Sequence, residues 1–251
     1  MKTCLQILLL ATLSGLPFSA GAELSARDIM QKVKDRDDGN NVVMDMDMIL
    51  IDSKGNKRER TVRSFRRDAP GNPDDAQSIM FFLSPANVEN TGFLTYDYDD
   101  GDKDDDQWLY LPALKKVKRI AAADKSGSFM GTDFTYADMS SPDLDDYDYK
   151  LMKEVDINGQ KAWQILSTPN SEDEIERTGY TKSVVFVRQD NFVVVRSVNW
   201  VKDGNKNKFM EVKDLQQVDG IWTPLEVVMT TKKGKETEHA SILKSRNVQY
   251  N

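Results

Sequence analysis

The sequence predicts a mainly β protein, an antiparallel sandwich or barrel of roughly ten or eleven strands. Apolar and polar residues alternate with period two along most of the chain after residue 40. Short connectors rich in Gly, Asp and Asn separate these alternating stretches, as hairpin turns do. No Pro-, Gly- or Ser-rich linker divides the chain, so we expect a single domain.

The N-terminal residues have the pattern of a cleavable secretory signal. A start carrying Lys2 precedes a mostly apolar stretch over 4–18, and Ala20-Gly21-Ala22 offers the small side chains that a signal peptidase reads. We predict a signal peptide over 1–22 and one mature domain over 23–251. No later apolar run approaches the about 18–20 residues needed to cross a bilayer.

The cysteine content and the net charge indicate where the protein works and which class of partner they argue against. The one cysteine, Cys4, lies inside the predicted signal, so the mature chain is expected to have no disulfide, thiol nucleophile or lipid-anchoring cysteine. We expect a soluble protein of the periplasm. Loss of Lys2 with the signal changes the net charge from −7 to −8, and this acidic balance argues against a nucleic-acid partner.

The first mature element is predicted to be a helix. Ser25-x-x-Asp28 resembles a capping box, and glycine near 37–39 can end the helix. Three apolar residues then share one face at helical spacing: Ile29, Met30 and Val33.

The remaining elements are predicted mostly as strands. The predicted strands are 42–51, 57–67, 78–83, 92–98, 107–111, 161–167, 183–188, 192–201, 206–215, 222–231 and 236–245. Two stretches interrupt them: a polar loop over 68–77, and a largely irregular excursion over 124–148 with a short helix over 133–140. Such an excursion in a β chain usually carries function or covers something.

Residues for catalysis are scarce. A Ser-His-Asp arrangement would depend entirely on His239, the one histidine, which we interpret as solvated or cross-strand. Zinc would need an atypical set of carboxylates, and no glycine-rich phosphate loop is present. No carboxylate pair stands out for glycosidase chemistry. We therefore predict a protein that is not an enzyme and that has no cofactor and no metal.

The acidic run 97–106 raises calcium as an alternative. Carboxylates at alternate positions with a glycine suit a flexible oxygen site. However, Gly101 falls at the fifth position from Asp97, and no glutamate closes the loop. We interpret the run as a solvated hairpin tip, with calcium left as the less favoured possibility.

Large adaptable apolar side chains favour an apolar cavity, because a partly open barrel of this size can hold such a ligand. The competing interpretation is ordinary core. For the strand 107–111, the pattern leaves open which face points inward, Trp108/Tyr110 or Leu109/Leu111. The predicted cavity residues are Met44, Met46, Met48, Phe81, Trp108, Tyr110, Phe129, Met130 and Phe134.

A basic cluster stands out in this acidic chain. It could hold an anionic head group, dock an acidic partner or form a solvated turn. Its members are Lys115, Lys116, Lys118 and Arg119. The arginine-rich strand over 58–67 could extend the same patch.

Two adjoining motifs carry a family resemblance. "WLYLPALKKVKRI" over 108–120 and "SGSFMGTDFTYADM" over 126–139 closely resemble LolA-like outer-membrane lipoprotein-sorting proteins, in particular the exported branch associated with RND-type (MMPL-like) lipid exporters. The resemblance extends over nearly the whole mature chain. It implies a half-open, curved antiparallel sheet whose concave, apolar side is covered by a few helices.

The resemblance also implies a function. Such proteins carry lipids or acylated lipoproteins through the periplasm by shielding acyl chains, and an inner-membrane transporter is the expected partner. We expect the protein to be a monomer. The basic cluster would lie at the rim of the cavity. The segment around Phe129 would form a lid, with Gly131 as its hinge and Asp133 capping the helix that follows. The alternative is a sensor module of the same fold that recognises lipid or mislocalised lipoprotein.

Overall fold

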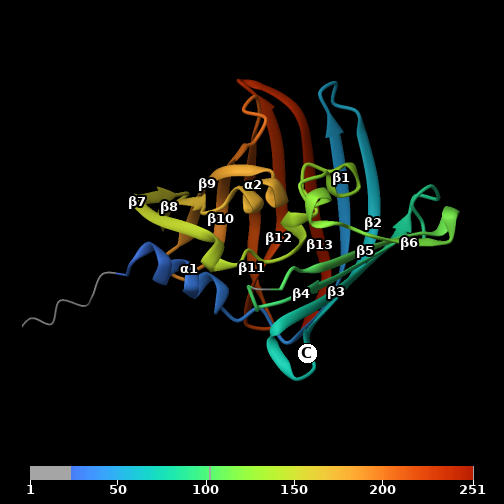
Figure 1. Ribbon diagram of the computed structural model, residues 1–251, viewed down its shortest axis with the longest axis horizontal. Helices are drawn as coiled ribbons and strands as arrows, with labels where there is room; N and C mark the ends of the chain where they lie inside the picture. Colours follow the sequence, from blue (N-terminus) through green and yellow to red (C-terminus); the bar gives the residue numbers. More distant parts are fainter. Residues whose placement is uncertain (1–23, 102, 251) are drawn as a thin grey trace, which may run out of the picture.

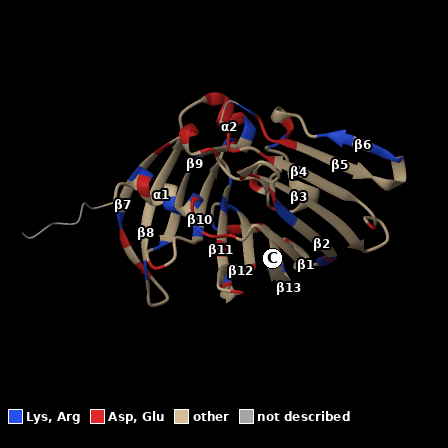
Figure 2. Cartoon of the chain, turned by 90° about the horizontal axis from the view of Figure 1, so that it is seen from below, with Lys and Arg blue, Asp and Glu red and all other residues tan. Residues whose placement is uncertain are grey.

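The computed structural model describes residues 24–101 and 103–250 as one antiparallel sheet of thirteen strands (Figure 1). The predicted signal peptide lies outside the described residues. The strand order is β6-β5-β4-β3-β2-β1-β13-β12-β11-β10-β9-β8-β7. The sheet curves without closing, and its edge strands β6 and β7 lie at opposite ends of the molecule (Figure 2). The predicted fold class, a half-open curved antiparallel sheet with few helices, is confirmed.

The elements have the following bounds. The strands are β1 Asn41–Asp52, β2 Lys57–Ala69, β3 Asn72–Ser84, β4 Gly92–Asp97, β5 Asp106–Leu111, β6 Lys116–Arg119, β7 Tyr147–Ile157, β8 Gln160–Pro169, β9 Tyr180–Arg188, β10 Val194–Val201, β11 Asn207–Val218, β12 Ile221–Lys233 and β13 Glu236–Tyr250. The helices are α1 Ala26–Lys34 and α2 Glu172–Thr178, with 3-10 turns at Pro112–Leu114, Ala122–Asp124, Phe129–Gly131, Ala137–Met139 and Leu144–Asp146. No helix in these described parts is long and apolar enough to cross a membrane.

The strand prediction missed β6 and β7, which are the two edges of the sheet. All four residues of β6 are exposed, and β7 is largely exposed, so neither shows the apolar alternation that marks a buried strand. The predicted loop over 68–77 is also wrong. β2 and β3 pair there up to Ala69 and Asn72, which leaves two residues for the turn.

The predicted N-terminal helix is confirmed at its start. Ser25 and Asp28 exchange the two hydrogen bonds of a capping box. The helix ends at Lys34, before the predicted 37–39, and its last hydrogen bond runs from the Asp35 N–H to the Gln31 carbonyl at 2.8 Å. Its apolar face packs on the sheet, with Ile29 buried against Ile165 of β8 and Val187 of β9.

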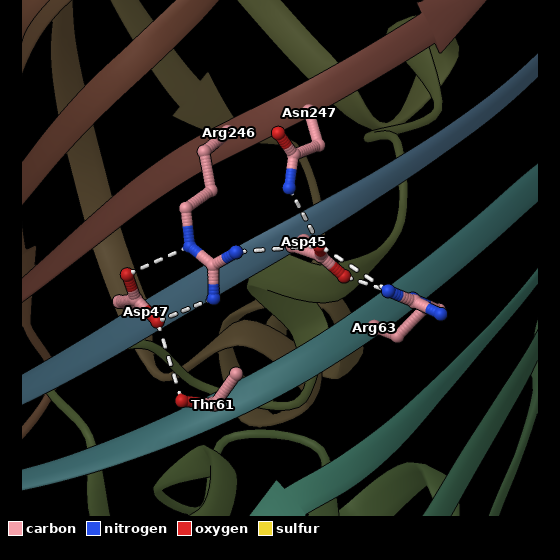
Figure 3. Close-up of polar contacts among 6 residues, drawn as sticks. All are labelled: Asp45, Asp47, Thr61, Arg63, Arg246 and Asn247. Atoms are coloured by element: carbon pink, nitrogen blue, oxygen red, sulfur yellow. Dashed lines mark hydrogen bonds and ion pairs between the residues drawn. The ribbon is translucent and has the colours of Figure 1, made fainter.

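The two faces of the sheet differ in chemistry. We call the face covered by the helices and by residues 120–146 the inner face, and the opposite one the outer face. Near the middle of the sheet, the outer face carries a charged network (Figure 3). Asp45 of β1 accepts hydrogen bonds there from Arg63 of β2, at 2.8 Å, and from Arg246 and Asn247 of β13. The inner face instead holds the apolar core.

Candidate functional site

The excursion predicted to carry function lies across the inner face of the β1–β5 half of the sheet. Phe129 is buried at its centre, with its ring 4.9 Å from that of Phe93 and 6.4 Å from that of Phe82. Tyr136 of the same excursion packs edge-on against Phe129 at 5.6 Å. The excursion therefore fills this half of the inner face as part of the core.

A buried carboxylate fixes the excursion to the sheet. Asp133 accepts hydrogen bonds from Ser241 Oγ of β13 at 2.7 Å and from Thr231 Oγ1 of β12 at 2.5 Å. The Asp133 N–H donates to the Ser241 oxygen at 2.9 Å. The predicted capping role of Asp133 is therefore wrong. The short helical turn Ala137–Met139 is instead preceded by reciprocal bonds between Thr135 and Asp138.

His239 belongs to the same polar cluster. It lies on β13, and its Nδ1 is 2.7 Å from Asp133 Oδ2. Ser241 donates its proton to the Asp133 carboxylate and makes no bond to the imidazole. A serine activated by histidine needs the opposite order of contacts. The three side chains thus position the excursion, a contact that a single sequence cannot reveal because Asp133 and His239 are far apart along the chain.

Further bonds hold the excursion along its length. Arg60 of β2 donates to the Met130 carbonyl at 2.5 Å, and Gln107 of β5 donates to the Tyr136 carbonyl at 2.9 Å. The buried Lys125 donates to the Asp105 carbonyl at 2.8 Å. Gly131 has φ +77°, as expected for a position that needs glycine. We name the segment 129–139 the strap.

An open cavity lies beside the strap, on the inner face of the β7–β12 half. Its volume is about 400 Å³, within the range of small-molecule sites. Elements above the sheet form one wall, including Met30 of α1, Phe134 of the strap and Thr178 of α2. The wall on the sheet side comes from the residues Tyr147, Tyr149, Ser167, Tyr180, Ser183, Val185, Val194, Ser197, Asn199, Met210, Val212, Pro224, Val227 and Met229.

The polar groups of the cavity wall are mostly neutral or paired. Burial raises the pKa of the Tyr149 phenol to about 12, and burial also raises the pKa of Tyr147 and Tyr180. All three phenols are therefore uncharged near neutral pH. Asp138 accepts from the Tyr180 hydroxyl at 2.9 Å, and Arg177 is paired with Glu174 at 2.6 Å. Such a wall can shield apolar chains without burying a free charge.

Comparisons with known proteins agree with this geometry. A family model described as that of an uncharacterized protein matches residues 74–251, well over half of the chain. Two solved structures match most of this chain, and the match also spans most of each of those structures. A DUF1329 family protein from Desulfovibrio piger has 26% identity and a TM-score of 0.81, with 90% of this chain and 92% of that one covered. A Vibrio parahaemolyticus domain named for outer-membrane lipoprotein sorting has 29% identity and a TM-score of 0.79, with the same coverage.

A LolA superfamily protein from Nitrosomonas europaea has the same fold at 14% identity, with a TM-score of 0.67 and coverage of 91% and 94%. The chain belongs to a LolA-like family. No curated protein matches it.

Within this LolA-like structure, the predicted cavity residues separate into three groups. Phe134 alone lines the open cavity. Met48 and Phe129 are buried in the core, with Met46 and Met130 packed against it, and Met44 is half-buried on the same side of β1. These methionines fill the half of the sheet that the strap covers.

Three of the predicted cavity residues lie on the outer face, and their prediction as lining residues is wrong. Phe81, Trp108 and Tyr110 alternate with the core residues Phe82 and Leu109. The choice left open for β5 is thereby decided, since Leu109 and Leu111 face the core. Both faces of these strands are apolar, and period two alone cannot tell which of them is buried.

The basic cluster forms an exposed edge strand and not the solvated turn that was one of its three interpretations. Lys115 follows the turn at φ +49°, and Lys116, Lys118 and Arg119 belong to β6. The basic cluster and the arginine-rich strand are separate, because β3, β4 and β5 lie between β2 and β6. Among the described residues, no group of three acidic, histidine or cysteine side chains is placed to hold a metal, so the calcium alternative gains no support.

Sequence reasoning missed most of the true lining residues. Tyr147 and Tyr149 come from an edge strand that was not predicted, and Tyr180 begins β9. Met210 and Met229 pair across β11 and β12, so the period-two pattern of those strands held a signal for a shared face. That pattern could predict that the two residues share a face of the sheet. It could not predict that a cavity lies above them.

Proposed function

We propose that the protein is a carrier that binds the acyl chain of a lipid or lipoprotein in the 400 Å³ cavity. The observation that carries this proposal is the incompletely covered apolar part of the inner face, where Val185, Val212 and Val227 line open space. The neighbouring half of the same face is filled by the strap. A LolA-like sheet with one half plugged and the other open is suited to a guest of limited size.

The driving force is the removal of methylene groups from water. Each buried methylene contributes about 0.8 kcal/mol. A chain segment of about ten methylenes would therefore contribute about 8 kcal/mol before the entropy of association is subtracted. A contribution of this size is enough to retain the cargo during transit. Release of the cargo then requires a partner or a movement of the strap.

The place of work and the partner follow from the same proposal. The signal-peptide pattern of residues 1–22 supports export to the periplasm. A carrier there would receive its cargo from an inner-membrane transporter and move it towards the outer membrane. The strap would act as the lid, with Gly131 at its turn and Asp133 as its latch.

The test is native mass spectrometry, with organic extraction, of mature protein purified from a periplasm without detergent. We expect stoichiometric lipid or acylated peptide on the wild type and at least a tenfold loss in Val212→Asp, because a carboxylate would be desolvated by the guest. Val198→Asp is the matched control, since Val198 lies between the cavity residues Ser197 and Asn199 and therefore points to the outer face, opposite Phe209.

Two outcomes would contradict the proposal. One is an empty wild-type protein that takes up neither added phospholipid nor acylated peptide. The other is equal loading of Val212→Asp and the wild type. An empty protein that captures a regulatory protein would favour the sensor alternative.

A further inference from the structure

The outer face of the β2–β6 half is apolar where an antiparallel sheet usually presents polar residues to water. Phe81 of β3, Tyr110 of β5 and Val117 of β6 stand in one cross-strand row, with Gly92 of β4 between the first two. A second row joins the outer-face residues Phe65, Ile79, Leu94 and Trp108. The two rows touch, since the Phe65 and Phe81 rings are 6.4 Å apart and meet edge to face.

This face holds most of the large apolar side chains exposed to solvent. Leu114 in the β5–β6 turn and Val117 are each 63% exposed, and Phe81 and Tyr110 are each 39% exposed. Of the seven such side chains in the described residues, six belong to this half of the sheet, and the seventh is Met152 of β7. Such a concentration marks an interaction surface. We call Phe65, Phe81, Tyr110, Leu114 and Val117 the outer apolar face.

Cations border the same face. Lys115 lies in the turn beside Leu114. Lys116 and Lys118 pair with the core-facing Leu111 and Leu109, so they extend from the inner side of the edge strand β6, which appears as a basic edge in Figure 2. Lys118 approaches Asp124 only at 3.5 Å, with both side chains more than half exposed. Within the described part of the chain, Lys115 and Lys116 form no ion pair. These cations are concentrated at one edge of a protein whose net charge is −7.

We propose that the outer apolar face docks on the surface of an anionic phospholipid membrane. Leu114 and Val117 enter the boundary between head groups and acyl chains. Lys116 and Lys118 extend from the opposite side of this edge strand, so that their ammonium groups reach lipid phosphates above that boundary. Trp108 and Tyr110 are of the types that favour this interface, with an apolar body and a polar tip.

The chemistry favours a membrane over the other possible occupants. A second copy docked on the same face would cover the aromatic rows but would bring no anionic surface to the lysines of this edge. A peptide strand added beside β6 would use the backbone of the edge, and it would leave the aromatic rows of β3 and β5 exposed. A bilayer surface covers both the rows and the turn. The inference is independent of the cavity, because the two surfaces share no residue.

The test is flotation of the purified wild-type chain with vesicles of phosphatidylcholine alone or mixed with phosphatidylglycerol. We expect binding to the mixed vesicles, weakened by salt, and little binding to the neutral ones. Lys115→Gln, Lys116→Gln and Lys118→Gln should each lower partitioning about fivefold. Leu114→Ser with Val117→Ser should lower it at least tenfold while leaving the near-ultraviolet circular dichroism unchanged, because both residues are exposed.

Matched controls are Met152→Ser and Lys150→Gln, which change the same side-chain types on β7. Val212→Asp should float like the wild type, so failure of the cavity proposal would not disturb this result. The proposal is overturned if the wild type stays at the bottom with every vesicle, or if the serine double variant floats like the wild type. A dimer in sedimentation that the double variant abolishes would also overturn it, in favour of self-association.

Discussion

Ser241 and Asp133 exchange two hydrogen bonds: the serine hydroxyl donates to the carboxylate at 2.7 Å and accepts from the aspartate N–H at 2.9 Å. The two residues are 108 positions apart, and Ser241 is fully buried. This reciprocal pair fastens the strap to the centre of the sheet, between its filled half and its open half.

Removal of the serine hydroxyl should loosen the strap. Ser241→Ala leaves a buried N–H without its acceptor, so we expect the free energy of unfolding to fall by about 1–3 kcal/mol. Hydrogen exchange should become faster in 129–139 than in the strands. The control is Ser245→Ala on the same strand, where no side-chain hydrogen bond is present in the described structure. Unchanged exchange in Ser241→Ala would show that the pair does not hold the strap.

Gly131 tests the backbone of the strap separately from its packing. A Cβ at this position would meet no atom within 4 Å, so the cost of a side chain comes only from φ +77°. Gly131→Val should lower the free energy of unfolding by about 1–2 kcal/mol and weaken retention of cargo. Gly131→Asn should lower the free energy of unfolding by less, because asparagine tolerates this positive φ. Equal stability of the valine variant and the wild type, measured by chemical denaturation, would contradict the prediction.

The outer-face network in Figure 3 should make the free energy of unfolding depend on pH. Hydrogen bonds from Arg63 and Asn247 lower the pKa of Asp45 to about 2. The carboxylate therefore stabilises the fold above its unfolded pKa of about 4, and this contribution is lost as the pH falls through about 2. Asp45→Asn should cost about 1 kcal/mol at pH 7.

The deficit of Asp45→Asn relative to the wild type should shrink between pH 4 and pH 2. Urea denaturation at several pH values measures it, with the exposed Asp148→Asn as the control. A deficit that stays constant down to pH 2 would be inconsistent with the lowered pKa.

Asp97 should make the fold less stable as the pH rises, which is the opposite of the effect of Asp45. Burial raises its pKa to about 6, and the neighbouring Asp105 carboxylate adds to the rise. The fold is therefore favoured below the unfolded pKa of about 4, and this advantage is lost as the pH rises through about 6. Asp97→Asn should stabilise the protein by about 1–2 kcal/mol at pH 7 and by nothing at pH 3. Asp104→Asn in the same loop is the control, and a gain that persists at pH 3 would refute the explanation.

Local patterns predicted those parts of the fold whose cause is local. The capping box at Ser25 and Asp28 depends on residues three apart, and the strands of the sheet interior alternate because one face is buried. The edges β6 and β7 lacked that pattern, since a strand with exposed side chains needs no apolar alternation. The positive φ of Gly131 was also predictable, because few other residues adopt it readily.

The sequence by itself determined a β-rich, cysteine-poor chain with a LolA-like signature and a glycine turn near Phe129. Only the tertiary structure decided which apolar faces are buried, which half of the inner face stays open, and that Trp108 and Tyr110 point outward. The reason is physical. Apolar side chains on both faces of a strand satisfy the same period, and burial depends on what the rest of the chain places above each face.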